Sequence, residues 1–244
     1  MSGYDTCVKG INGEVFESMP TAQLNRAAIT AAVPNEQGVY QLLHESKLVY
    51  IGKTDADAGL RARLVRHADK IMHRAGLDPR TVTFKAIRLF VFTVMDLETE
   101  LLKTYMPAWN GRGFGSNDPG RERDTTRIKP VNFDAQFPHD IHRLLEFPIP
   151  PGAEYSAEAV LQAIQASVPW KLRRQNRGGR KCHSDLETTL VKISGTANNA
   201  WTLLAEIVSQ LPPGWQATAL KSHAILYKES RDYPDPLAVA RSPD

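Results

Sequence analysis

The sequence predicts an α+β protein built in two parts. Two observations indicate this fold class. Strand-like and helix-like segments follow one another in the order β-β-α-β-α between about residues 36 and 125, and in the order αβαββ from 144 to 231. The length of 244 residues allows one large domain or two small ones, and 42% hydrophobic and 23% charged residues are ordinary for a globular protein.

The first part shows strand and helix periods in turn. Its expected elements are two strands at 39–43 and 48–51, a helix from 60 to about 74, a strand within 82–94, and a helix from 97 to 105. Pro107 stops the last helix. A further helix over 22–32, capped by Ser18 or Thr21, is expected within an N-terminal lead-in of residues 1–35.

The second part begins after a loop rich in Gly, Asn, Asp and Pro and a linker expected at 126–143. The expected elements of the module 144–231 are a helix at 157–168 capped by Ser156, a strand at 190–193, a helix at 197–211, and a hairpin of 215–220 with 224–227. Residues 232–244, with three prolines, are expected to form a frayed tail.

The positive charge of the chain is concentrated in one short run. The formal net charge is +3, yet residues 171–181 contain six basic side chains and no acidic one, so the remainder carries a net −3. These six residues are Lys171, Arg173, Arg174, Arg177, Arg180 and Lys181. Arginines beside flexible glycines favour contact with DNA, and a solvated loop is the alternative.

Several function classes are excluded by composition. No apolar run approaches the roughly 18–20 residues that a membrane span needs, and the N-terminus lacks the pattern of a secretion signal. The two cysteines, Cys7 and Cys182, lie at opposite ends of the chain, which favours a reducing compartment over a disulfide framework. We therefore expect a cytoplasmic protein with no membrane association and no organic cofactor.

Five landmarks follow one another over about 75 residues: Gly38-Val39-Tyr40, Tyr50-Ile51-Gly52, Arg63 with His67, Glu98, and Asn110. In order and spacing they resemble the GIY-YIG nuclease family, with Val in place of the central Ile of the first block. The Gly-Phe-Gly and Asp-Pro-Gly that follow are similar to type II restriction endonucleases of this family. The resemblance covers about residues 36–125 and implies a small mixed β-sheet flanked by helices, and metal-dependent hydrolysis of phosphodiester bonds in DNA.

The resemblance also implies a role for each landmark. Glu98, twelve positions before Asn110, is the expected metal ligand. One Mg²⁺ (or Mn²⁺) per active site can bind through a single carboxylate when phosphate oxygens and water complete its shell. Glu100 is the rival ligand. Tyr40 is expected to orient or deprotonate the attacking water, with Lys53 and Arg63 as the cations that lower the pKa of its phenol.

Arg63 and His67 are four residues apart on the predicted helix and therefore share one face. A guanidinium can bind two phosphate oxygens and stays charged, so Arg63 is expected to stabilise the pentavalent transition state. Arg61 and Arg66 are expected to project elsewhere. His67 is expected to bond a tyrosine or to assist a proton transfer.

Tyr50 is expected to support the phosphate or the water network, and Asn110 to tie the end of the last helix to the site by amide hydrogen bonds. Together these expectations describe a sequence-specific type II restriction endonuclease that cuts both strands of double-stranded DNA. A palindromic target favours a homodimer. The alternatives are a nicking repair or homing nuclease, a modification-dependent defence nuclease, and a catalytically inactive DNA-binding protein.

Overall fold

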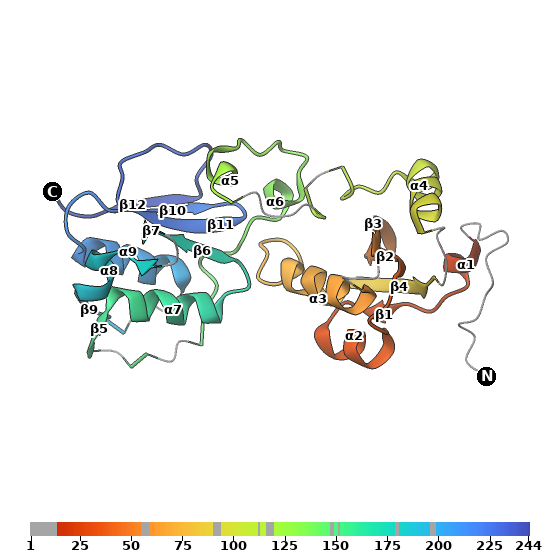
Figure 1. Ribbon diagram of the computed structural model, residues 1–244, viewed down its shortest axis with the longest axis horizontal. Coiled ribbons are helices and arrows are strands. Elements are labelled where there is room, and N and C mark those ends of the chain that lie inside the picture. The colour runs from red at the N-terminus through yellow and green to blue at the C-terminus, as the bar shows by residue number, and fades with distance from the viewer. Residues whose placement is uncertain are drawn as a thin grey trace. The chain divides into compact units, whose positions relative to one another are not determined.

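The computed structural model describes residues 14–54, 59–89, 94–111, 113–115, 120–146, 149–150, 152–178, 181–195 and 199–244. The chain divides into two compact units (Figure 1). The first comprises residues 1–72, 76–116 and 131–133, and the second 73–75, 117–130 and 134–244. Both combine helices with small sheets, which confirms the α+β fold class. Within the described ranges, no helix has the length and apolar character needed to cross a membrane.

The first unit is organised around a four-stranded sheet in the order β1-β4-β2-β3. Its strands are β1 (Ala22–Gln23), β2 (Gly38–His44), β3 (Lys47–Thr54) and β4 (Val82–Arg88). The predicted hairpin is confirmed, and both residues of its turn, Glu45 and Ser46, have positive φ. The expectation of a mixed sheet is wrong here, since all described pairings are antiparallel. A two-residue turn reverses β2 into β3, and β4 starts opposite the end of β2, at His44.

Helices surround this sheet (Figure 1). They are α1 (Glu14–Glu17), α2 (Arg26–Ala32), α3 (Leu60–Ile71), a 3₁₀ turn η1 (Pro79–Thr81) and α4 (Val94–Tyr105). Leu97 and Leu101 of α4 pack with Val39 and Ile51 on one face of the sheet. Because side chains alternate along a strand, Tyr40 points to the opposite face, where it meets α3. The two predicted helices that carry the landmarks are confirmed, although α3 ends three residues early.

The N-terminal helix begins later than the sequence predicts. Instead of spanning 22–32 with Ser18 or Thr21 as its cap, α2 starts at Arg26 after Asn25, whose side-chain oxygen accepts a backbone N–H of the first turn. The residues before it form β1 and pair with β4. Cross-strand pairing therefore takes the first part of the predicted helix, and the lead-in is a component of the first unit.

The second unit contains a four-stranded sheet in the order β12-β10-β11-β6 and two ribbons, β5–β9 and β7–β8. Its strands are β5 (Glu154–Ser156), β6 (Lys171–Arg174), β7 (Asn176–Gly178), β8 (Lys181–Cys182), β9 (Leu190–Lys192), β10 (Gln216–Leu220), β11 (His223–Tyr227) and β12 (Ala238–Arg241). Its helices are α5 (Glu122–Thr125), α6 (Phe133–Gln136, which begins on the last residue of the first unit), α7 (Ala157–Ser167), α8 (Ser184–Thr188) and α9 (Ala200–Gln210). Ser156 caps α7 as predicted.

Two expectations for this half are wrong. The tail from 232 is not frayed, because β12 pairs with β10 along four residues and completes the sheet. Residues 126–143 are not a loose linker, because they contain α6 and the buried side chains of Asp134 and His139. The basic run, for which a solvated loop was the alternative interpretation, supplies β6, β7 and β8, and β6 lies parallel to β11.

Candidate active site

The two motif glycines are required by close packing. A side chain on Gly38 would place its Cβ 2.1 Å from the carbonyl oxygen of Ile87, where β2 and β4 approach each other. A Cβ on Gly52 would lie 2.4 Å from the hydroxyl oxygen of Tyr40. Both distances are shorter than real Cβ atoms show. The glycines therefore let the sheet bring its two motif tyrosines onto one face.

Tyr40 lies at the centre of a compact polar cluster. Its hydroxyl oxygen is 2.7 Å from Nε2 of His67, and Nε of Arg63 donates to it across 3.3 Å. The ring of Tyr50 lies 6.0 Å from that of Tyr40 and 5.1 Å from that of His67. Strand β2, strand β3 and helix α3 thus bring together four of the predicted site residues. Arg61, by contrast, donates to the carbonyl of Val33, away from this cluster.

Burial sets the protonation states of this pair. It raises the pKa of Tyr40 well above the ordinary phenol value, and the repulsion from Tyr50 adds to this, so that the opposing effect of Arg63 is outweighed. Burial, with the charges of Arg63 and Lys70, holds the pKa of His67 well below its usual value. At neutral pH both groups are neutral. Arg63 does lower the pKa of the Tyr40 phenol, as expected, but burial raises it by more, so the expected net lowering is wrong.

A short loop after α4 covers the cluster. Arg63 donates through Nη2 to the carbonyl of Gly115 (3.0 Å), and Lys70 donates through Nζ to the carbonyls of Gly113 (2.9 Å) and Phe114 (2.5 Å). The ring of Phe114 stacks on His67 at 4.8 Å with an interplanar angle of 9° and is 1% exposed. Sequence reasoning assigned Phe114 and Lys70 no role in the site. The sequence signal that could have found Phe114 is the Gly-Phe-Gly that follows Asn110. An aromatic side chain between two glycines can insert into a site because its neighbours have no side chains to block the approach.

One nitrogen of the site histidine has no visible partner. Nδ1 of His67 is buried and makes no hydrogen bond within the described part of the chain. Leaving a buried polar atom unpaired costs about 1–3 kcal/mol of folding free energy. Such a cost is retained more readily where the group takes part in chemistry than where it only packs.

Glu98 of α4 is paired with Lys53 of β3, with 3.2 Å between Nζ and Oε2. Lys53 therefore serves the carboxylate and not the phenol of Tyr40. Asn110 binds the backbone of Ile51 twice: its Oδ1 accepts from the N–H at 2.8 Å, and its Nδ2 donates to the carbonyl at 2.6 Å. These bonds hold the end of the α4 segment on β3, as the sequence predicts. The side chain of Glu100 lies outside the described residues.

A divalent metal fits this carboxylate only if the substrate supplies most of its ligands. Among the described residues, no three His, Cys, Asp or Glu side chains cluster as a metal site. The Glu98 side chain is 18% exposed, so it can be reached from solvent. Mg²⁺ commonly keeps several waters and binds through one or two carboxylates together with substrate phosphates. The donor set at Glu98 is consistent with that mode.

The described contacts form two groups on either side of β3. Tyr40 lies opposite Gly52 and Val39 opposite Lys53, so the Tyr40 cluster and the Lys53–Glu98 pair face opposite sides of the sheet. In the described strand order β3 is an edge strand. Among the described contacts none joins Glu98 to the Tyr40 cluster, although each group includes a residue of this edge strand.

The basic run is partly neutralised within the second unit. Arg173 pairs with Asp124, whose side chain is 1% exposed, and Arg174 pairs with Glu158 at 2.7 Å. These two arginines stabilise the module and are not displayed for phosphates. Lys171 and Lys181 are exposed, as is Arg177, whereas Arg180 lies outside the described residues.

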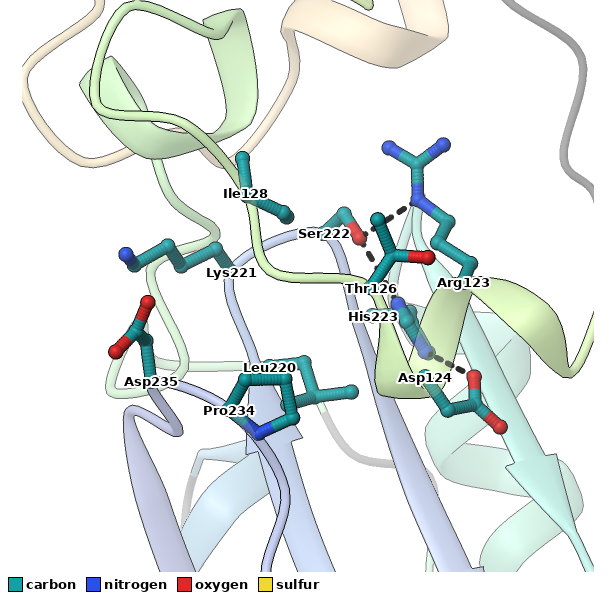
Figure 2. A pocket seen from close by; sticks show the side chains of 10 residues that line it. All are labelled: Arg123, Asp124, Thr126, Ile128, Leu220, Lys221, Ser222, His223, Pro234 and Asp235. Carbon is teal, nitrogen blue, oxygen red and sulfur yellow. Dashed lines mark hydrogen bonds and ion pairs between the residues drawn. The ribbon is translucent and has the colours of Figure 1, made fainter.

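A Ser-His-Asp arrangement in the second unit has the contacts of a hydrolytic triad but not the space (Figure 2). Ser222 Oγ lies 2.9 Å from Nδ1 of His223, and Nε2 of His223 lies 2.7 Å from Asp124. The adjoining cavity measures about 10 Å³, room for one water at most, and Arg123 already donates to Ser222 at 3.0 Å. Burial raises the pKa of Asp124, but the hydrogen bond from His223 and the charge of Arg173 outweigh this and lower it. The cluster holds α5 on β11.

The first unit thus holds the residue set of the predicted nuclease site: a buried tyrosine–histidine pair, an arginine beside it, and a partly exposed carboxylate on α4. Comparison with protein families agrees. Residues 21–135 match the family described as the Eco29kI GIY-YIG domain, a type II restriction endonuclease family. This part of the chain thus matches a GIY-YIG restriction endonuclease domain, and the match supports a DNA endonuclease. No curated protein matches the chain.

Proposed function

We propose that this protein is a Mg²⁺-dependent, sequence-specific type II restriction endonuclease that cuts both strands of duplex DNA. The observation that carries the proposal is the 2.7 Å contact between Tyr40 and His67, with Arg63 on the same hydroxyl. A neutral histidine beside a buried phenol is a proton acceptor that the phenol alone is not.

The pair can move one proton without leaving a charge on the phenol. The attacking water gives a proton to the hydroxyl oxygen of Tyr40, while the proton of Tyr40 passes to Nε2 of His67. The hydroxide then attacks phosphorus as the bond from phosphorus to the leaving oxygen breaks, and that oxygen takes a proton from solvent. The imidazolium meanwhile holds its proton beside the Phe114 ring. Because the pKa of His67 is low, the imidazolium readily loses that proton again when the product leaves.

Arg63 is the phosphate-binding group in this proposal. Its contacts with Tyr40 and Gly115 use part of a guanidinium that carries five N–H donors, so further donors serve a phosphate oxygen. Glu98 would hold Mg²⁺ (or Mn²⁺), one per site, with Lys53 fixing the carboxylate in the free enzyme. When bound, the ion neutralises charge on the phosphate and on the leaving oxygen.

We also propose a homodimer in the cytoplasm. One site per chain cuts one strand, and a two-fold pair of chains matches a palindromic target. Cys182 is a free thiol, in keeping with a reducing compartment.

The test is cleavage of supercoiled plasmid by the purified full-length chain, with Mg²⁺, with Mn²⁺ and with EDTA. Discrete bands whose ends map to one sequence are expected with the ions alone. Glu98→Ala should abolish cutting, whereas Glu17→Ala, at an exposed position on α1, should not. Nicked circles alone would favour a nicking repair or homing enzyme, and cutting restricted to modified plasmid a modification-dependent defence nuclease. Binding without cutting would favour an inactive DNA-binding protein, and cutting in EDTA would refute the requirement for a metal ion.

A further inference from the structure

Strand β7 differs from the other described strands of its module in its exposure. With β8 it forms a two-stranded sheet apart from the four-stranded sheet, as β5 does with β9. All three residues of β7 are exposed, whereas β10 and β11 are buried along their whole length. An isolated two-stranded ribbon is marginally stable in water. A ribbon with both faces of one strand in solvent therefore has to be held by the rest of the module.

Contacts at the base of the ribbon supply this support. Glu158 of α7 accepts from Sγ of Cys182 (3.0 Å) and pairs with Arg174 just before β7. Arg173, one residue earlier, is fixed to Asp124. Two cations of the basic run therefore anchor the ribbon to the module. The ribbon beyond them is presented to solvent on a rigid base.

A β-bulge displays one arginine. The register shifts between Asn176 and Gly178, so Arg177 is the extra residue of β7. A bulge redirects a side chain and is common at functional edges. The Arg177 side chain is 53% exposed, and its nearest carboxylate, that of Glu187, lies 3.9 Å away and is equally exposed. Such a surface pair contributes little and is easily exchanged for another partner.

A groove of about 670 Å³ lies along the ribbon. Its lining includes Arg121, Gln175 and Asn176, together with the anchoring pair of Arg174 and Glu158. Guanidinium and amide groups are the side chains that read guanine and adenine edges bidentately. The surface around the ribbon thus combines exposed cations with base-reading side chains.

We propose that the β7–β8 ribbon enters the major groove of duplex DNA, where Arg177 and Asn176 contact base edges and Lys181 contacts a phosphate. The major groove is wide enough for a two-stranded ribbon, and its edges distinguish all four base pairs. The ribbon thereby contributes to the choice of cleavage site. The inference rests on the proposed function only in taking duplex DNA as the substrate.

The test measures binding of the full-length chain in EDTA, so that no cleavage occurs. A labelled non-target duplex gives the slope of log K against log salt, and selection from a randomised duplex pool gives the sequence preference. Lys181→Ala removes the cation assigned to a phosphate and should make the slope shallower by about one unit. Arg177→Lys keeps the charge but loses the planar fork, so it should leave the slope unchanged and relax preference at one base pair roughly 10- to 100-fold.

The matched control removes two exposed lysines elsewhere in the module, with Lys129→Ala and Lys192→Ala, and should change neither readout. All variants should melt like the wild type, because the side chains are exposed. An equal change of slope in ribbon and control variants would overturn the inference, and so would an unaltered sequence preference in Arg177→Lys. Plasmid cleavage separates the two proposals. If the ribbon variants cut at the same site as the wild type with the same preference, the role of the ribbon in site choice is refuted and the nuclease function is not. If binding depends on the ribbon but the wild type does not cut, the nuclease function is refuted and the DNA contact of the ribbon is not.

Discussion

Gly115→Ala should disable the nuclease site although it adds a single methyl group outside the motif. The new Cβ would lie 2.3 Å from the Tyr50 hydroxyl oxygen, where ordinary contact begins at 3.4 Å, so loop or ring has to move by about 1 Å. The ring cannot swing away freely, because it packs against Tyr40, His67 and Phe114. Misplacing a catalytic group by 1 Å can cost about 10²-fold in rate. We expect a loss of that order in single-turnover plasmid cleavage, and about 1–3 kcal/mol in the free energy of unfolding from overpacking.

The matched control is Gly111→Ala, because a Cβ on Gly111 meets nothing within 4 Å. A double-mutant cycle then locates the clash. Tyr50→Phe removes the atom at 2.3 Å and leaves the nearest ring carbon at 3.1 Å, so Gly115→Ala should be markedly less destabilising in that background. Wild-type or faster cleavage by Gly115→Ala would refute the loop position. A destabilisation that is equal with and without the hydroxyl would refute the contact with Tyr50.

Three further predictions concern buried polar groups. Tyr40→Phe should slow plasmid cleavage by about 10²–10⁴-fold and lower the free energy of unfolding by about 1–3 kcal/mol, because it leaves Nε2 of His67 unpaired; near-normal cleavage would move the proton acceptor elsewhere. Asp124→Ala should lower the urea-unfolding free energy by about 3–5 kcal/mol, since it removes the buried carboxylate that binds the Arg173 guanidinium and Nε2 of His223, whereas the exposed Asp232→Ala should change it little. Burial lowers the pKa of both His67 and His139, so the unfolded chain binds their protons more tightly and stability should fall as the pH drops below about 6.5. A flat free energy of unfolding between pH 7.5 and 5 would contradict this.

The core of the nuclease site could be predicted because its signals are local. Tyr40, Tyr50 and Asn110 lie where the motif spacing puts them, and strand alternation or helix spacing is enough to align their side chains. The pKa of Tyr40 could not be predicted in the same way. Its direction depends on how completely α3 and the loop after α4 exclude water, and one sequence does not reveal how much burial outweighs a neighbouring cation. The Gly-Phe-Gly marks Phe114 as an aromatic that can insert into a site, but one sequence does not reveal that the ring it stacks on is that of His67.

The basic run shows why local charge is a weaker guide than local spacing. Six cations without an acid nearby in the sequence indicate an exposed surface only if no carboxylate from another part of the chain folds onto them. Here Asp124 and Glu158 do. Asp124 is 49 residues from Arg173, and it reaches β6 only because α5 folds onto the edge of the second sheet. A buried arginine paired in this way is a structural element, and its removal costs stability before it costs affinity. The same reasoning makes exposure on both faces of β7, rather than the number of arginines, the feature that points to DNA.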